Sequence, residues 1–552
     1  MVCPGVRRGS GHHGKRSSRV HSAGGLGNET RGGRVEPVAL PRFRERSGLR
    51  RSAGPVARFF RLHETTMDII LRGYEVNEPT WFYLSTVLIL AVFFRFGRWL
   101  SLRNLDLLLL LAISPGLLLT KYRPEIGHAW LFVGAGVLLV RLLLDPLCRR
   151  RPKLEINLNR AGTTFLCLAA FAFLMTKVLT EPPPDTAVAT VREASRLLKL
   201  DAPRQAANDG EAVPGPAARL LAAPVVPTSR LVAQGPGQGA GSSAVEQLAA
   251  RILAVLSHAA VVCGLLMIGR THFGDVTLGI SMATLYLLVP CTAYDVAKVN
   301  HVLPAALALW AFALCHRPFW AGCLMGLAAG VMFFPLFLIP LWWKFYGRRA
   351  CKPFLAGLAT VAAALLLVVL IVSPDVSSVY RQTIGAIDWS VLQFRGGTAS
   401  GFWSQHNEAY RLPVMVAAFV LYLALTFVPW RKTPEHLLAQ STAIILATQL
   451  WYPQQGGAYV LWYLPSLIAV VFRPRLFHSP AVLLGHREQR SRTEDDDVQE
   501  SEPATVVMAP PLTPPPEARR PTHGTTTPHV GTRRSSSPVR APISHHDGNG
   551  AR

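Results

Sequence analysis

The chain has 552 residues, of which 50% are hydrophobic and 16% are charged, whereas about 25% are charged in an ordinary soluble domain. A soluble fold could not cover so many apolar runs with so little polar surface, which excludes an ordinary soluble enzyme. The net charge is +24, and residues 1–66 supply a large part of it because they carry 14 Lys/Arg against 4 Asp/Glu. Much of the remainder lies in short loops, where basic residues orient membrane proteins, so no nucleic-acid partner is predicted.

The basic N-terminal segment, residues 1–66, is rich in Gly, Ser and Arg and contains no apolar run long enough for a signal-peptide core. The composition changes at Met67, where the sequence MDIILRGYEVNEPTWFYLS leads into the first apolar segment. Two interpretations remain: a disordered basic extension, or a mis-assigned start with translation beginning at Met67. The topology predicted below favours the second, because it would place the extension on the external side.

Apolar segments fill most of the chain from residue 81 to residue 472. A helix needs roughly 20 apolar residues to cross a bilayer core of about 30 Å. The candidate segments, about twelve, are 81–97, 104–120, 128–147, 161–180, 248–269, 275–291, 302–316, 319–343, 353–373, 412–429, 436–452 and 456–472. The predicted fold class is therefore all-α, a polytopic transmembrane helical bundle, most plausibly in the plasma (inner) membrane.

The basic loops predict the orientation of the bundle, because Lys and Arg are enriched on the cytoplasmic side. The clusters assigned to that side are Arg95/Arg98/Arg103, Arg149/Arg150/Arg151/Lys153, Lys344/Arg348/Arg349/Lys352, Arg431/Lys432 and Arg473/Arg475. The loops 181–247 and 374–411 then lie outside. The segment 319–343 can be one tilted helix or two short helices broken near Phe334–Pro335. Arg317 and the Lys344 cluster share a side only if it is a broken, re-entrant pair.

The two long external loops differ in composition. In 181–247, the segment TVREASRLLKL has a helical apolar face, typical either of an interfacial amphipathic helix on the membrane or of a short solvated helix. The rest of this loop, 202–243, is Ala/Pro/Gly-rich and is predicted to be disordered. The 374–411 loop is aromatic and polar, as expected of a loop that folds over a site. Residues 473–552 are predicted to form a disordered cytoplasmic tail.

Motifs for several enzyme classes are missing from the sequence. It contains no GxxxxGK[ST] loop, no GxGxxG after a strand, no HExxH and no GxSxG. Its eight cysteines are scattered, without CxxC or metal-ligand spacing. An ATP-driven pump and a metalloprotease are therefore disfavoured, and no cofactor is predicted.

Polar residues gather at the external ends of the apolar segments. The first cluster consists of Asp295, Lys298, Asn300 and His301, and the second contains Trp403, His406, Glu408 and Arg411. Each cluster alone is typical of a solvated interfacial cap. Because both are predicted on one side, and polar groups beside lipid need polar neighbours or water, we expect Asp295, His301, His406 and Glu408 to line one external cavity.

Part of the chain, about 275–472, resembles a known family. The text LYLLVPCTAYDVAKVNHVLPAALALWAF, then WAGCLMGLAAGVMFFPLFLIPLWWKFYGRR, is similar to multi-spanning glycosyltransferases of the GT-C class, especially the DUF2029-type group that resembles polyprenyl-phosphate-mannose-dependent mannosyltransferases. The residues that match its small-residue helix are Gly322, Gly326, Leu327, Ala328, Pro335 and Pro340. One departure is that apolar residues around Met332–Phe333 replace the family's lysine.

The resemblance implies sugar transfer from a polyprenyl-phosphate donor on the outer face, with membrane lipids as the surroundings. A carboxylate would act as general base, and the candidates are Asp295, Glu181 and Asp185. Cationic and hydrogen-bonding groups would hold the substrates, and the candidates are Lys298, Asn300, His301, Trp403, His406, Glu408 and Arg411. A transporter or flippase and a non-enzymatic membrane scaffold remain the alternatives.

Overall fold

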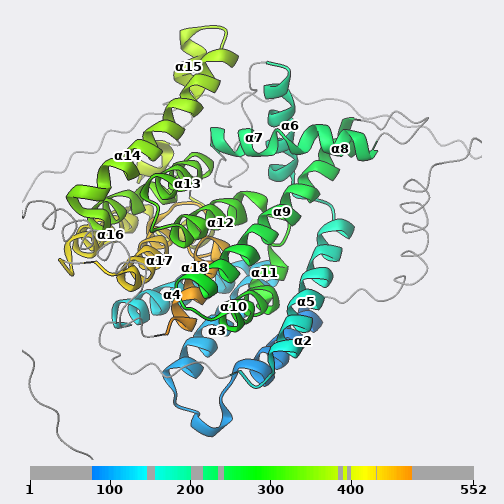
Figure 1. Ribbon diagram of the computed structural model, residues 1–552, viewed down its shortest axis with the longest axis vertical. Helices are drawn as coiled ribbons and strands as arrows, with labels where there is room; N and C mark the ends of the chain where they lie inside the picture. The colour runs from blue at the N-terminus through cyan, green and yellow to red at the C-terminus, as the bar shows by residue number, and fades with distance from the viewer. Residues whose placement is uncertain are drawn as a thin grey trace, which may run out of the picture. The chain divides into compact units, whose positions relative to one another are not determined.

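The computed structural model describes residues 78–145, 156–200, 215–233, 242–382, 389–394, 399–430 and 432–474. Within these ranges the secondary structure is helical and contains no strand, which confirms the predicted all-α class (Figure 1). The expectations for residues 1–66 and for the tail beyond Pro474 lie outside the described residues, as do Arg149–Lys153, Arg431 and Arg475.

Two of the four described N-terminal helices, α3 and α5, begin at polar side-chain caps. The four are α2 (Glu78–Phe93), α3 (Leu102–Tyr122), α4 (Pro124–Leu143) and α5 (Arg160–Thr180). The side chain of Ser101 accepts a hydrogen bond from the amide of Asn104 at the start of α3, and Asn159 does the same for Gly162 at the start of α5. These caps satisfy amides that the first turn of a helix leaves unpaired, so the boundaries follow from local sequence.

The second half of the chain supplies most of the buried core. Its helices are α9 (Ser242–Thr271), α10 (Val276–Leu288), α11 (Pro290–Tyr294), α12 (Val299–Ala313), α13 (Pro318–Val331), α14 (Ile339–Val372), α15 (Val376–Gln382), α16 (Arg411–Phe427), α17 (Pro434–Trp451) and α18 (Val460–Phe472). Helices α10, α17 and α18 are buried along nearly their whole length. Peripheral helices such as α16 instead expose much of their apolar surface.

Six helical segments in the described ranges are long and apolar enough to cross a membrane: Leu102–Tyr122, Pro124–Leu143, Arg160–Thr180, Ser242–Thr271, Ala350–Val372 and Glu408–Phe427. Other apolar helices, such as α10, α12 and α18, have 13 to 15 residues. The expected number of about twelve spans is not confirmed, because only these six described helices combine sufficient length with sufficient hydropathy.

Of the two alternatives for 319–343, the structure has the broken form. Helix α13 ends at Val331, and Met332 has extended backbone with φ −144° and ψ 152°. A 3-10 turn, Phe334–Leu338, then leads into α14. Gly347 bends α14 with φ 60°, and the hydroxyl of Tyr346 donates to the carbonyl of Cys315 at 2.7 Å. Tyr346 therefore lies at the same end of the bundle as the start of α13, so the chain has reversed its direction between them.

Glycines allow α13 and the later part of α14 to lie parallel in direct backbone contact (Figure 1). A Cβ on Gly322 would collide with the carbonyl oxygen of Phe354, and a Cβ on Gly357 would collide with that of Phe319. One turn further along α13, a Cβ on Gly326 would lie 3.2 Å from the Cβ of Val361. Small residues at this spacing let membrane helices approach closely.

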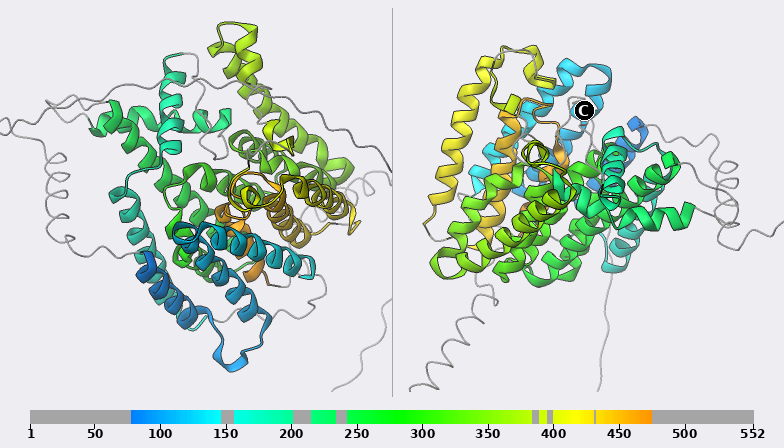
Figure 2. Two further views of the ribbon diagram at one scale, coloured as in Figure 1. Left: turned by 180° about the vertical axis from the view of Figure 1, so that it is seen from behind. Right: turned by 90° about the horizontal axis from the view of Figure 1, so that it is seen from above.

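Three short helices between α5 and α9 correct the sequence expectations for this loop. They are α6 (Asp185–Leu198), α7 (Pro216–Ala222) and α8 (Val225–Ala233), and they lie together beside the start of α9 in Figure 1 and in both views of Figure 2. The apolar face of α6 packs on protein at Val191 and Ala194, which are buried. Helices α7 and α8 lie within 202–243, which was predicted to be disordered, so that prediction is wrong for these two segments.

A buried charge network joins α3, α4 and the end of α18. The guanidinium of Arg141 in α4 donates to both carboxylate oxygens of Asp106 in α3, at 2.6 and 2.8 Å. Arg473, just after α18, donates to Asp145 at 2.6 Å. Burial lowers the pKa of Arg473 from its ordinary value. Such networks fix the register of neighbouring helices because breaking one partner leaves a buried charge uncompensated.

Candidate functional site

Lysines of α3 and α5 meet the segment 293–298, which joins the end of α11 to the start of α12 and contains a third lysine, Lys298. Lys177 of α5 donates from Nζ to the carbonyl of Ala293 at 2.7 Å. Lys121, at the end of α3, places Nζ 5.1 Å from the ring centroid of Tyr294. Nζ of Lys298 lies 3.1 Å from Oδ1 of Asp295. We call this group, Lys121, Lys177, Asp295 and Lys298, the lysine turn.

Asp295 is the one carboxylate of the lysine turn and is 7% exposed. Although the ammonium of Lys298 is close, the geometry gives Oδ1 no aligned hydrogen bond. The backbone carbonyl of Val296, the next residue, is held by the imidazole Nε2 of His258 at 2.9 Å. The hydrogen bond from His258 therefore fixes the turn to α9. The carboxylate of Asp295 can still accept a proton or a hydrogen bond from a hydroxyl.

The other two candidate bases lie at the rim. Glu181 follows α5 and pairs with Lys177 at 3.5 Å, with about half of its side chain exposed. Since Lys177 also contacts Ala293, Glu181 belongs to the surroundings of the lysine turn. Asp185 is the first residue of α6 and is exposed.

Asn300 and His301 are buried, each 4% exposed, contrary to the expectation of a solvated cap. The amide oxygen of Asn300 accepts a hydrogen bond from the hydroxyl of Thr190 in α6 at 3.3 Å. His301 stacks on Tyr459, with ring centroids 4.9 Å apart. Both side chains therefore connect the first turn of α12 to neighbouring helices, and Asn300 is occupied by the α6 contact.

The second polar cluster is built mainly from structural contacts. Nε1 of Trp403, which is 3% exposed, donates to the carbonyl of Leu450 at 3.1 Å. His406 is exposed and bonds through Nδ1 to the carbonyl of Phe402 at 2.9 Å. Oε1 of Glu408 accepts from the amide of Ala399 at 3.0 Å. These bonds hold the 399–410 segment, and only Glu408 keeps a second carboxylate oxygen without a partner.

Arg411 is fully buried at the start of α16. Its Nη2 donates to the carbonyls of Val391 and Gln393, and its guanidinium lies 4.9 Å from the ring centroid of Phe394. Nε and Nη1 have no hydrogen-bond partner. The residue therefore anchors the 389–394 segment and retains two unused donors.

The two polar clusters contact the same segment, residues 449–462. The 399–405 stretch pairs with it through the Ser400 amide and the Pro453 carbonyl at 3.0 Å, and His301 contacts Tyr459 in it. His301 and the 399–405 stretch therefore lie at the same end of the bundle. A cavity shared by Asp295, His301, His406 and Glu408 stays a prediction.

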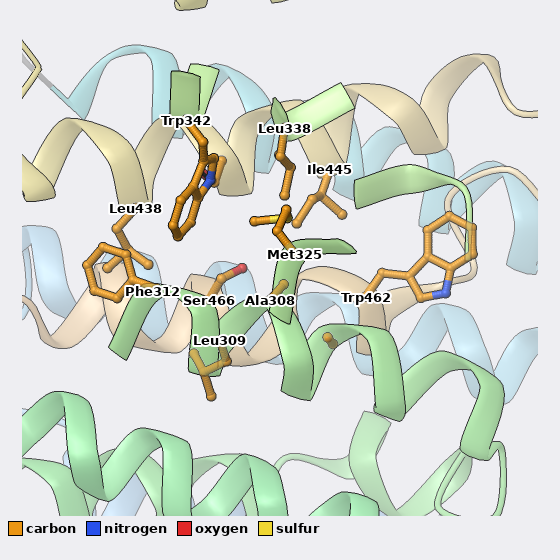
Figure 3. A pocket seen from close by; sticks show the side chains of 12 residues that line it. Ala308, Leu309, Phe312, Met325, Leu338, Trp342, Leu438, Ile445, Trp462 and Ser466 are labelled. Atoms are coloured by element: carbon orange, nitrogen blue, oxygen red, sulfur yellow. Dashed lines mark hydrogen bonds between the residues drawn. The ribbon is translucent and has the colours of Figure 1, made fainter. Parts of the chain in front are cut away.

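A small enclosed cavity lies deeper in the bundle and contains none of the predicted site residues (Figure 3). It is lined by Ala305, Ala308, Leu309, Phe312, Met325, Leu338, Trp342, Leu438, Ser441, Ile445, Trp462 and Ser466. Figure 3 shows the indoles of Trp342 and Trp462 on opposite sides of Met325 and Leu338. Its apolar lining offers no catalytic group.

Sequence reasoning missed Lys121 and Lys177, together with Tyr294. Lys121 directly follows the predicted apolar segment 104–120, and Lys177 lies near the end of 161–180. A basic residue at such a position is typical of an interfacial anchor. The available signal was that Lys121 and Lys177 end segments predicted to run outward, toward the loop that contains Asp295.

The apolar helices and the polar clusters at their ends define an integral membrane protein. Residues 242–471 match the sequence profile of glycosyltransferase family 87. The match runs from the first residue of α9 to the last turn of α18, and it includes Asp295 and Lys298 but not Lys121 or Lys177. Together, the helices and the match support a membrane glycosyltransferase. No curated protein and no solved structure matches the chain.

Proposed function

We propose that the chain transfers a sugar from a lipid-phosphate donor to a hydroxyl acceptor, and that the lysine turn is the reaction site. The observation that carries this proposal is that Lys298 pairs with the buried carboxylate of Asp295, while Lys177 and Lys121 contact Ala293 and Tyr294 of the same turn. A departing phosphate monoester gains charge as its bond to the sugar breaks, and preorganised cations stabilise that charge.

The carboxylate of Asp295 supplies the complementary function. The acceptor oxygen bonds to the anomeric carbon, the bond from that carbon to the phosphate oxygen breaks, and its electron pair leaves with the phosphate. The acceptor's proton moves to Asp295 as general base. Glu181 is the second candidate for this role because it shares Lys177 with the lysine turn. Asp185, on the exposed edge of α6, is the third.

The remaining predicted residues have roles set by their contacts. Arg411, with two unused donors, and Lys298 are proposed to contact the donor phosphate. Glu408 and His406 are proposed to contact the acceptor from the 399–410 segment, while Asn300, His301 and Trp403 orient the elements that carry them. The site is proposed to face the extracytoplasmic side of the plasma (inner) membrane.

The test is turnover of a polyprenyl-phosphate sugar by the purified full chain, measured as release of polyprenyl phosphate. Lys177→Met and Lys298→Met should each lower kcat/KM by about 10- to 100-fold, as expected for loss of one charge-assisted contact. Lys199→Met, at the exposed end of α6, is the matched control and should retain wild-type turnover. Equal rates in all three variants would remove the lysine turn from the reaction.

A further inference from the structure

Two lysines approach each other at the end of the bundle opposite to the lysine turn. In α14, Nζ of Lys344 lies 3.7 Å from the ring centroid of Trp430 and 5.7 Å from that of Phe427. Lys432 follows two residues after Trp430. Burial and the positive charge of Lys344 lower the pKa of Lys432 to about 8. In the described part of the chain, neither lysine pairs with a carboxylate.

The hydrogen-bonding capacity of the two ammonium groups differs. Lys432 donates to the carbonyls of Leu425 and Val428 and to Oε1 of Gln440, which uses all three of its N–H groups. Among the residues that the structure describes, Lys344 contacts only aromatic ring faces. Its donors are therefore available to an external acceptor, and the nearby charge of Lys432 makes an anionic acceptor preferable.

The surroundings of this lysine pair combine basic and exposed aromatic groups. Trp343 is 55% exposed and Trp430 is 74% exposed, as is typical of indoles at a membrane–water interface. Arg348, one turn after Lys344, is also exposed. Basic residues scattered in loops are sufficient to set topology. A half-buried like-charge pair beside an indole is not required for that role, and it costs electrostatic energy unless an anion lies between the charges.

We infer that Lys344, Lys432 and Trp430 form a binding site for the phosphate of an anionic phospholipid. Phosphate oxygens accept from the ammonium of Lys344, and the charge of Lys432 is compensated at short range. A lipid is favoured as the source because Phe427 and Val428, 51% and 66% exposed, give its acyl chains an adjacent apolar surface. The inference does not depend on the proposed glycosyl transfer.

Native mass spectrometry of the detergent-purified full chain tests this site, with phosphatidylglycerol and phosphatidylcholine of identical acyl chains as probes. Wild type should retain phosphatidylglycerol preferentially, and Lys344→Gln should reduce that retention about fivefold, the contribution of roughly one basic residue at an anionic surface. Lys352→Gln removes the same charge from an exposed position beyond the bend at Gly347, and it should leave the retention unchanged.

Lys344→Arg provides a second arm, because it keeps the charge and should keep the preference for phosphatidylglycerol. Thermal unfolding of each variant separates lost binding from lost folding. Equal retention of the two lipids by the wild type would overturn the inference. Equal loss in Lys344→Gln and Lys352→Gln would do so as well, since it would reduce the effect to net charge.

Discussion

The indole Nε1 of Trp462 donates a hydrogen bond to Nδ1 of His301 at 2.8 Å, and both side chains are buried. An indole nitrogen can only donate, so Nδ1 must be the acceptor and the ring carries its proton on Nε2. The bond joins α18 to the first turn of α12, directly after the lysine turn. It thereby holds the element that carries Asp295 and Lys298.

Trp462→Phe should destabilise the protein by about 1–3 kcal/mol, because it leaves a buried acceptor without its partner while keeping an aromatic ring. The expected readout is a lower apparent Tm in detergent. Trp320→Phe, at a position 55% exposed, is the control and should leave the Tm unchanged. If the two variants unfold at the same temperature, the hydrogen bond does not contribute to holding α12.

Gly322→Ala should destabilise the α13–α14 pair by about 1–3 kcal/mol, the usual cost of overpacking, since the added Cβ meets the backbone of Phe354. Gly136→Ala in α4, where a Cβ meets nothing within 4 Å, should be neutral or stabilising by up to about 1 kcal/mol. Apparent Tm values of both variants measure this. A Gly322→Ala protein as stable as Gly136→Ala would contradict the close backbone packing.

The loop containing Ser400 is predicted to lie outside and the turn containing Thr433 inside. Ser400→Cys should therefore react with an impermeant thiol reagent in intact cells, and Thr433→Cys should react only after permeabilisation. The exposed Thr433 makes a negative result in intact cells meaningful. Labelling of Thr433→Cys alone in intact cells would show that the orientation is inverted.

The pKa of Lys432 gives a pH dependence with a defined sign. Because burial and Lys344 lower this pKa from 10.5 to about 8, the unfolded chain binds more protons than the folded chain between these values. Stability therefore rises with pH across that window. Lys432→Gln should flatten the rise in apparent Tm between pH 8 and 10.5. An unchanged slope in this variant would assign the titration to another group.

The fold class was predictable because long apolar runs require helices in lipid. For 319–343 the sequence left a single and a broken helix open, and the chain reverses between Arg317 and Lys344 only in the broken form. The hydrogen bond from Tyr346 to Cys315 confirms that reversal. The helices α7 and α8 were not predictable, because their Ala/Pro/Gly-rich sequence is typical of disorder and their stability comes from burial against the bundle.

The site was only partly predictable for a related reason. Asp295 and Lys298 stand out in the sequence because they interrupt an apolar region. Lys121 and Lys177 look like ordinary interfacial anchors, and only tertiary packing brings them to the carbonyl of Ala293 and the ring of Tyr294. Sequence spacing carries no information about such a meeting of three helices, since the residues are separated by more than a hundred positions.

The measurement that tests the account most directly is turnover of a polyprenyl-phosphate sugar by Asp295→Asn, compared with the wild-type full chain. The substitution keeps the shape of the side chain and removes the proton acceptor. Turnover should fall by about 100-fold or more, as expected for loss of a general base, while the apparent Tm stays within the range of the wild type. Turnover within about twofold of the wild type, at normal stability, would contradict Asp295 as the base and the lysine turn as the site of transfer.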